Sequence, residues 1–257
     1  MPEFDSNGVS INYVVEGADP PIVLVHGFAS SLQGNWRAPG IFDALVKSGR
    51  RVIALDCRGH GRSGKPHDPE AYADNAMPND VIALMDHLGI AKADLLGYSM
   101  GGIISATLLA TCPERLGAVI LAGVGDALVL GAMPREQSES IARAMESSDG
   151  GQSETEIARN FRIFAERTGN DLAALAATQR TPRRHNYDPA KLGQVRQPVL
   201  VLIGEGDTLV GSADKLAATI PGAACVKVPG DHLTALGPAF APVVLKFLAE
   251  ASPVPAA

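Results

Sequence analysis

Short, uninterrupted apolar runs recur along this chain and alternate with stretches of helical spacing. The runs at 22–25, 51–55, 117–122 and 198–203 consist mostly of Val, Ile, Leu and Ala. Such runs are typical of strands that are buried on both faces, in contrast to the alternating pattern of a half-exposed strand. Apolar strands that alternate with helices predict a parallel, doubly wound sheet with helices on both faces.

Further strands are predicted at both ends of this series. Residues 9–16 alternate well enough for a strand, and the turn signal Ser6-Asn7-Gly8 places a short partner strand at Phe4. With one strand that ends at Leu95-Leu96 and another around 224–228, we expect a sheet of eight strands that is mostly parallel. Helical spacing in the same part of the chain predicts helices over 36–47, 77–88, 103–111, 212–220 and 238–249.

The alternation of strands and helices lapses between Asp126 and Gln197. This segment is polar and Arg-rich, has no strand candidate, and shows helical stretches at 138–145, 155–167 and 172–179. Because strands continue on both sides of it, we interpret 1–125 and 198–257 as one core domain and 126–197 as a helical cap inserted into it. Its apolar positions can form only part of a pocket roof: Leu128, Met133, Ile141, Phe161, Phe164 and Leu172.

Composition excludes several classes of function. The chain of 257 residues is 46% hydrophobic and 19% charged, which is ordinary for a globular protein, and its net charge of −6 gives no reason to expect nucleic acid or an anionic membrane as partner. No signal peptide is visible, and no segment approaches the roughly 18 apolar residues needed to span a membrane. The three cysteines are widely spaced and match no disulfide or metal pattern. We therefore expect a soluble, cytoplasmic protein.

Candidate chemistry centres on the sequence Gly97-Tyr98-Ser99-Met100-Gly101, which lies between an apolar strand and a helix. A G-x-S-x-G sequence in that setting predicts a nucleophile elbow, in which a tight turn lifts the serine hydroxyl clear of the sheet. Side chains at the two glycine positions would collide with neighbouring backbone in such a turn. The following helix begins with free N–H groups and the positive end of its dipole close to the serine.

An acid at a strand end, Asp207, and a loop histidine, His232, follow Ser99 along the chain. A serine hydroxyl is a poor nucleophile at pH 7 and needs an adjacent general base. A neutral imidazole at His232 can take the Ser99 proton and return it to the leaving group. Asp207 would hold the imidazole tautomer and stabilise the imidazolium.

In this order of motifs the sequence resembles the α/β-hydrolase fold superfamily over nearly its whole length, and its serine-nucleophile branch of esterases and lactonases in particular. The resemblance implies an eight-stranded α/β-hydrolase core with the triad Ser99, Asp207 and His232. It also places a second oxyanion donor in the loop after the third strand, so the oxyanion hole is assigned to the N–H groups of Phe28 and Met100. The matching pieces are HGF at 26–28, DCRGHGRS at 56–63, GYSMGG at 97–102, GEGD at 204–207 and GDH at 230–232.

Other residues compete for these roles. Asp126 lies just beyond a predicted strand, where some branches of the superfamily place the acid, although Asp207 is favoured. Among six histidines, His26 is expected to order the oxyanion loop and His60 its own loop. Further sites with a mainly structural interpretation but a possible substrate contact are Asp56, Arg58, Tyr98 and the Arg183-Arg184 pair, which could meet a carboxylate.

A serine at the elbow argues against the haloalkane dehalogenase and epoxide hydrolase branches, which attack through an aspartate there. It implies acyl transfer to water, so the first hypothesis is a hydrolase of small carboxylic esters or lactones that needs no metal or organic cofactor. Enol-lactone hydrolases resemble the chain in size and in their SMGG elbow. The alternatives are a carbon–carbon bond hydrolase of ring-cleavage products, a cofactor-free perhydrolase, and a ligand-binding receptor on the same fold.

Overall fold

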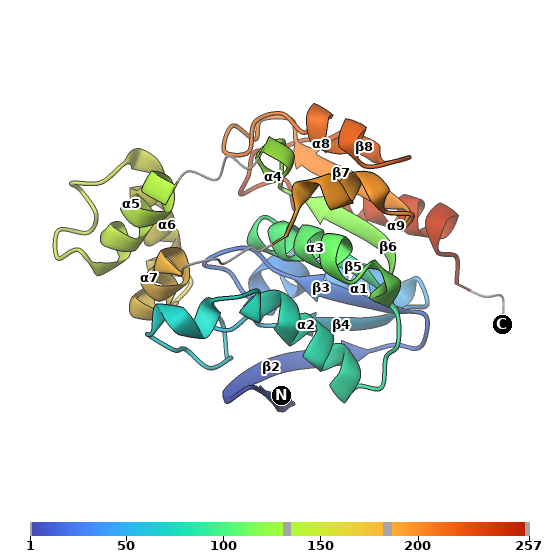
Figure 1. The fold of residues 1–257 in the computed structure, drawn as a ribbon, viewed down its shortest axis with the longest axis horizontal. Coiled ribbons are helices and arrows are strands. Elements are labelled where there is room, and N and C mark those ends of the chain that lie inside the picture. Colours follow the sequence, from blue (N-terminus) through green and yellow to red (C-terminus); the bar gives the residue numbers. More distant parts are fainter. Residues whose placement is uncertain (1, 131–134, 182–186, 255–257) are drawn as a thin grey trace.

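The computed structural model describes residues 2–130, 135–181 and 187–254, and its strands form one sheet in the order β1-β2-β4-β3-β5-β6-β7-β8 (Figure 1). The β1–β2 and β2–β4 pairs are antiparallel and all other pairs are parallel. The expected eight-stranded, mostly parallel sheet is therefore confirmed. The strands are β1 (Glu3–Ser6), β2 (Val9–Glu16), β3 (Pro21–Val25), β4 (Arg51–Leu55), β5 (Ala93–Tyr98), β6 (Leu116–Ala122), β7 (Val199–Gly204) and β8 (Ala224–Val228).

Alternate residues of each central strand enter two different apolar cores. Ile22 and Leu24 of β3 pack with α1 (Ile41–Lys47) and α9 (Phe240–Ala251) on one face. The neighbouring Val23 and Val25 pack with helices on the other face, α2 (Ala76–His87), α3 (Met100–Thr111) and α8 (Asp214–Thr219). Each fully buried Val, Leu or Ile side chain contributes about 1.5–3 kcal/mol relative to exposure. Two-sided burial thus explains why these strands are continuous apolar runs.

The prediction of one helix over 36–47 is wrong. The chain forms a π-helical turn, η1 (Gln33–Arg37), and α1 begins only at Ile41. Pro39 and Gly40 separate the two elements, and Gly40 has a left-handed φ of 78° that an α-helix does not accommodate. Trp36 is nevertheless fully buried in the same core as α1, which accounts for the helical spacing in the sequence.

Helices form between β6 and β7. Those over 135–180 gather to one side of the sheet in Figure 1, whereas the first, over 127–130, lies beside α8. Two of them begin at well-defined caps, because Thr155 accepts a hydrogen bond from the Ala158 N–H and Asp171 from the Ala174 N–H. No strand occurs in the described residues of this segment. Its helices are α4 (Ala127–Leu130), α5 (Arg135–Glu146), α6 (Glu156–Arg167) and α7 (Leu172–Arg180). The described residues also form the 3-10 turns η2 (Pro69–Tyr72), η3 (Pro113–Arg115) and η4 (Pro189–Gln194).

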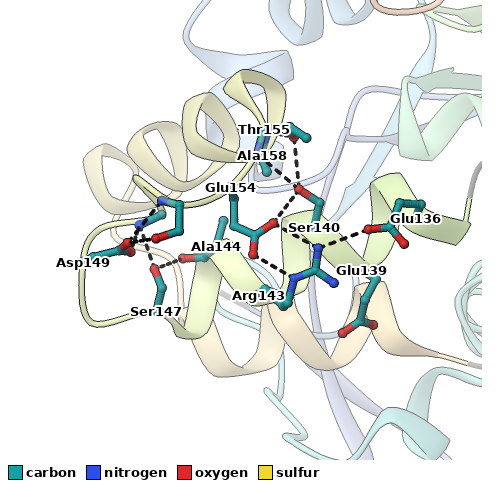
Figure 2. A network of polar contacts seen from close by, with 12 residues as sticks. Glu136, Glu139, Ser140, Arg143, Ala144, Ser147, Asp149, Glu154, Thr155 and Ala158 are labelled. Carbon is teal, nitrogen blue, oxygen red and sulfur yellow. Dashed lines mark hydrogen bonds and ion pairs between the residues drawn. The ribbon is translucent and has the colours of Figure 1, made fainter.

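A polar network joins α5 to the start of α6 (Figure 2). The Arg143 guanidinium donates to Glu154, with Nε 2.7 Å from Oε1, and also reaches Glu136. Ser140 donates to Glu154 over 2.9 Å. These hydrogen bonds lower the pKa of the Glu154 carboxyl. Because the Arg143 side chain is 41% exposed, we expect the network to orient the loop between the helices more than to stabilise the fold.

Two other features bear on the expected setting of the protein. Across the described ranges, no helix is both long enough and apolar enough to cross a membrane. Cys57, Cys112 and Cys225 are all free thiols.

Candidate active site

Ser99 occupies a strained turn between β5 and α3. Its φ of 54° and ψ of −113° lie outside the regions that side-chain-bearing residues favour. A Cβ on Gly97 would lie 2.0 Å from the Gly101 carbonyl oxygen, and a Cβ on Gly101 would lie 2.0 Å from the Val25 carbonyl oxygen. Only glycine fits at both positions. The predicted strand–turn–helix geometry around Ser99 is therefore present.

A continuous chain of hydrogen bonds links Ser99 to two loops that lie more than 100 residues later in the sequence. His232, in the loop after β8, has its Nε2 2.9 Å from Ser99 Oγ and its Nδ1 2.7 Å from Asp207 Oδ2. The Asp207 side chain follows β7 and is fully buried. Its Oδ1 accepts the N–H groups of Leu209 and Val210 at 3.1 and 3.3 Å. The structure thus brings together all three residues expected to form the triad.

Tyr98 contacts both the backbone and the ring of His232, a role that the sequence did not indicate. Its hydroxyl donates to the His232 carbonyl oxygen over 2.6 Å, and the two ring centroids are 5.6 Å apart. Burial raises the pKa of Tyr98, which keeps the hydroxyl protonated as a donor. The variable position of the G-x-S-x-G motif carries no signal for this contact.

The two residues assigned to an oxyanion hole both border the space beside Ser99. Phe28 and Met100 line the same cavity as Ser99. Met100 is the first residue of α3, and the first N–H groups of a helix have no partner inside it. The Phe28 N–H has no hydrogen bond to any described residue.

His26 anchors the loop that contains Phe28, as predicted. Its Nδ1 is 2.8 Å from the Gly27 carbonyl oxygen, and its Nε2 accepts the Cys57 N–H at 3.0 Å. Burial lowers the pKa of His26 to about 4, so the ring is neutral and the Nδ1–H donates. His60 similarly donates to the Arg58 carbonyl in its own loop.

A second anchor of the same loop comes from the segment between β6 and β7, and sequence reasoning missed it. Ala29 follows Phe28 and has a left-handed φ of 56°. Its carbonyl oxygen accepts hydrogen bonds from Thr168 Oγ1 at 3.1 Å and Asn170 Nδ2 at 2.8 Å, just after α6. The Phe28 ring also packs against Phe161 of α6, with centroids 5.5 Å apart.

The competing candidates lie elsewhere. Asp126 Oδ1 accepts the N–H groups of Lys215 and Leu216 at the start of α8, and it does not contact His232. Asp56 is buried and accepts the N–H groups of Leu32 and Arg62, and Arg58 is paired with buried Asp80. These are structural contacts. Arg183, Arg184 and Met133 lie outside the described residues.

Two cavities open beside Ser99 and His232. One, of about 310 Å³, extends between the core and α4–α7 and is mostly apolar; Leu128, Ile141 and Phe161 line it. The other, of about 480 Å³, is bounded by Phe161 and Phe164 on one side and by the turn at 30–39 on the other. Leu172 packs against the core instead. In the described part of the chain, no cluster of His, Cys, Asp and Glu could hold a metal ion.

Comparison with known proteins agrees with this geometry. The model of the alpha/beta hydrolase fold family matches residues 20–191. Over 112 residues, 42% of this chain, the sequence is 42% identical to the dihydrolipoyllysine-residue acetyltransferase component of the acetoin cleaving system of Pseudomonas putida. Over 119 residues, 46% of this chain, it is 34% identical to an epoxide hydrolase of Caballeronia sordidicola. These matches span 28% and 35% of the relatives' own lengths.

A solved structure matches over almost the whole chain. The enol-lactonase of Burkholderia xenovorans LB400 is 27% identical in sequence and has a TM-score of 0.71. The alignment covers 96% of this chain and 100% of that one. The matched family model spans more than half of the sequence. The strand order of the sheet, the turn at Ser99 and the similarity to the enol-lactonase structure agree with this match. The chain belongs to the alpha/beta hydrolase fold family.

Proposed function

We propose that this alpha/beta hydrolase cleaves small carboxylic esters or lactones through an acyl-enzyme, with Ser99 as nucleophile, His232 as general base and Asp207 as the acid that orients it. The observation that supports the proposal is the unbroken chain from Asp207 through His232 to Ser99, which ends where two cavities open.

The contacts of His232 suit proton transfer. Asp207 has a carboxylate oxygen 2.7 Å from Nδ1, so it favours the tautomer with a proton on Nδ1 and a free lone pair on Nε2. That lone pair lies 2.9 Å from Ser99 Oγ. As Oγ attacks the substrate carbonyl, its proton passes to Nε2, and the imidazolium then gives this proton to the departing alkoxide. In the second half of the reaction, His232 takes a proton from water, the water oxygen attacks the acyl-enzyme, and the proton passes to Ser99 Oγ as the acid is released.

The developing oxyanion needs donors that are already in place. Phe28 and Met100 both line the cavity that Ser99 lines, the Phe28 N–H has no hydrogen bond to a described residue, and Met100 is the first residue of α3, where an N–H lacks a partner inside the helix. Each donor of this kind contributes on the order of 100- to 1000-fold in rate. The strained backbone at Ser99 and the anchors on the Phe28 loop keep these groups preorganised, so they need not reorganise during the reaction.

We propose that residues 126–197 act as a cap that shapes the substrate site. The apolar cavity beneath α4–α7 fits the acyl part, and the larger cavity beside the turn at 30–39 fits the leaving group. Phe161 of α6 borders both cavities and would separate the two halves of the substrate. The presence of serine rather than aspartate at the elbow supports acyl transfer over epoxide opening, and the whole-length similarity to an enol-lactonase supports lactones as a substrate class.

A substrate panel with a covalent label tests the proposal. The purified chain is assayed on p-nitrophenyl esters, enol-lactones and a vinylogous 1,5-diketone, and a fluorophosphonate label is mapped by mass spectrometry. We expect turnover of esters or lactones and a single label on Ser99. Faster turnover of the diketone would favour a carbon–carbon bond hydrolase, and perhydrolysis exceeding hydrolysis in peroxide would favour that branch. Binding without turnover of any substrate would favour a receptor and overturn the proposal.

A further inference from the structure

The apolar cavity beside Ser99 has an uneven distribution of polar groups. Its floor is formed by residues of the core, including Ser99, Met100 and Val124, and beyond Ser99 and His232 this floor is apolar. Its roof contains two carboxamides, Gln137 of α5 and Gln179 of α7. The cavity that Ser99 lines is therefore also bounded by these two carboxamide residues from the segment between β6 and β7.

Neither carboxamide has a protein partner in the part of the chain that the structure describes. Gln137 and Gln179 are both partly buried, and neither forms a side-chain hydrogen bond to a described residue. A polar group in an apolar setting is costly unless it is hydrogen-bonded. In ligand sites, a few such groups among apolar walls orient the ligand.

The lack of charged side chains among the described residues around the cavity restricts which ligand groups can bind to the two carboxamides. Apart from His232, none of the described residues that line this cavity is ionisable at neutral pH. A carboxylate or ammonium on the acyl part would lose its hydration without gaining a counter-ion. A carboxamide both donates and accepts, so it pairs well with a neutral carbonyl, hydroxyl or amide.

We propose that the acyl part of the substrate is uncharged and carries a second hydrogen-bonding group, such as a ketone, hydroxyl or amide, which Gln137 and Gln179 bind at the far end of the cavity. This inference rests on the proposed function. A plain alkyl acyl group would leave both carboxamides desolvated and unpaired, whereas a polar end satisfies them. We expect this difference to change kcat/KM about tenfold or more.

Three acyl groups of nearly equal shape test the proposal. The p-nitrophenyl esters of 5-oxohexanoate, 5-methylhexanoate and hydrogen glutarate differ only at the far end, which is a ketone, an isopropyl group or a carboxylate. We expect the oxo ester to have the highest kcat/KM, by about tenfold over the methyl ester, and the glutarate ester to be poor. In Gln137→Leu and Gln179→Leu the preference for the oxo ester should fall toward unity. Gln152→Leu, an exposed glutamine in the same segment, is the matched control and should retain it.

The ratio of two esters on one preparation does not depend on how much of a variant is folded. Equal kcat/KM for the oxo and methyl esters, a preference that survives in both variants, or the glutarate ester as best substrate would each overturn the proposal. If neither these esters nor the lactones of the substrate panel are hydrolysed, the proposed function fails. Calorimetry with 5-oxohexanamide and 5-methylhexanamide then decides the inference separately: tighter binding of the oxo amide, lost in Gln137→Leu, supports it, and equal binding overturns it.

Discussion

Replacing Asp207 by Asn removes the negative charge and one acceptor oxygen but keeps the shape of the buried side chain. The Asn oxygen can still accept the N–H groups of Leu209 and Val210 that now bond to Oδ1. Its NH2 group then faces His232 Nδ1, where the carboxylate oxygen lies at 2.7 Å in the native protein. A donor at that place requires an unprotonated Nδ1 and so favours the tautomer with a proton on Nε2. That nitrogen can no longer accept the Ser99 proton over its 2.9 Å contact.

We therefore expect Asp207→Asn to lower kcat by roughly 10³–10⁴, as for triad acids in serine proteases. At 1.36 kcal/mol for each factor of ten, this corresponds to about 4–5.5 kcal/mol of lost transition-state stabilisation. The assay is kcat on the best ester of the panel, with the melting temperature measured in parallel. Because the substitution keeps the shape of the buried side chain, stability should change much less than activity.

Asp126→Asn is the matched control. Asp126 accepts two N–H groups at the start of α8, and Asn can also accept them. The loss of a charge at this helix end costs about 0.3–1 kcal/mol of stability, and kcat should stay near that of the parent. If Asp207→Asn keeps a tenth or more of the parental kcat, or if Asp126→Asn is the more damaging change, the assignment of the acid is refuted.

Three further predictions follow from the same contacts. Ser99→Ala should lose nearly all turnover and the fluorophosphonate label while melting near the parent temperature; parental turnover would contradict the mechanism. Simple esters of about two to six acyl carbons should be better substrates than long ones, since each buried CH₂ contributes about 0.8 kcal/mol only while it fits the cavity; kcat/KM that climbs to twelve carbons would argue for an open groove. Burial lowers the pKa of His26 to about 4 and of His60 to about 3, so the unfolded chain takes up these protons first, near pH 6.5. Stability is then lost on acidification, by about 2 kcal/mol per histidine between pH 7 and 5, and equal urea unfolding free energies at the two pH values would contradict this linkage.

The core of the fold was readable from the sequence because burial on both faces imposes a pattern on each strand separately. Runs such as 22–25 and 117–122 are apolar throughout, and they match β3 and β6 within one residue. The helix expected over 36–47 shows the limit of this reasoning. Trp36 and α1 share one apolar core, which produces helical spacing across a backbone that Pro39 and Gly40 interrupt.

The candidate triad was also predictable, since the position of each member depends on a local motif at the end of a strand. Parallel strands place their carboxyl ends along one edge, so Ser99, Asp207 and the loop with His232 had to lie near each other. The choice between Asp207 and Asp126 is different in kind. Both follow strands, and only the structure shows that one carboxylate reaches His232 while the other caps α8.

What surrounds the triad was decided by tertiary structure alone. The hydrogen bond from Tyr98 to His232 and those from Thr168 and Asn170 to the Ala29 carbonyl join residues far apart in sequence. The two carboxamides likewise line a cavity together with Ser99, from which they are distant in sequence. A periodic pattern reports only whether a position is buried, because burial repeats with the geometry of a strand or helix. It does not report which side chain from a distant element lies opposite, and that pairing determines what the site can bind.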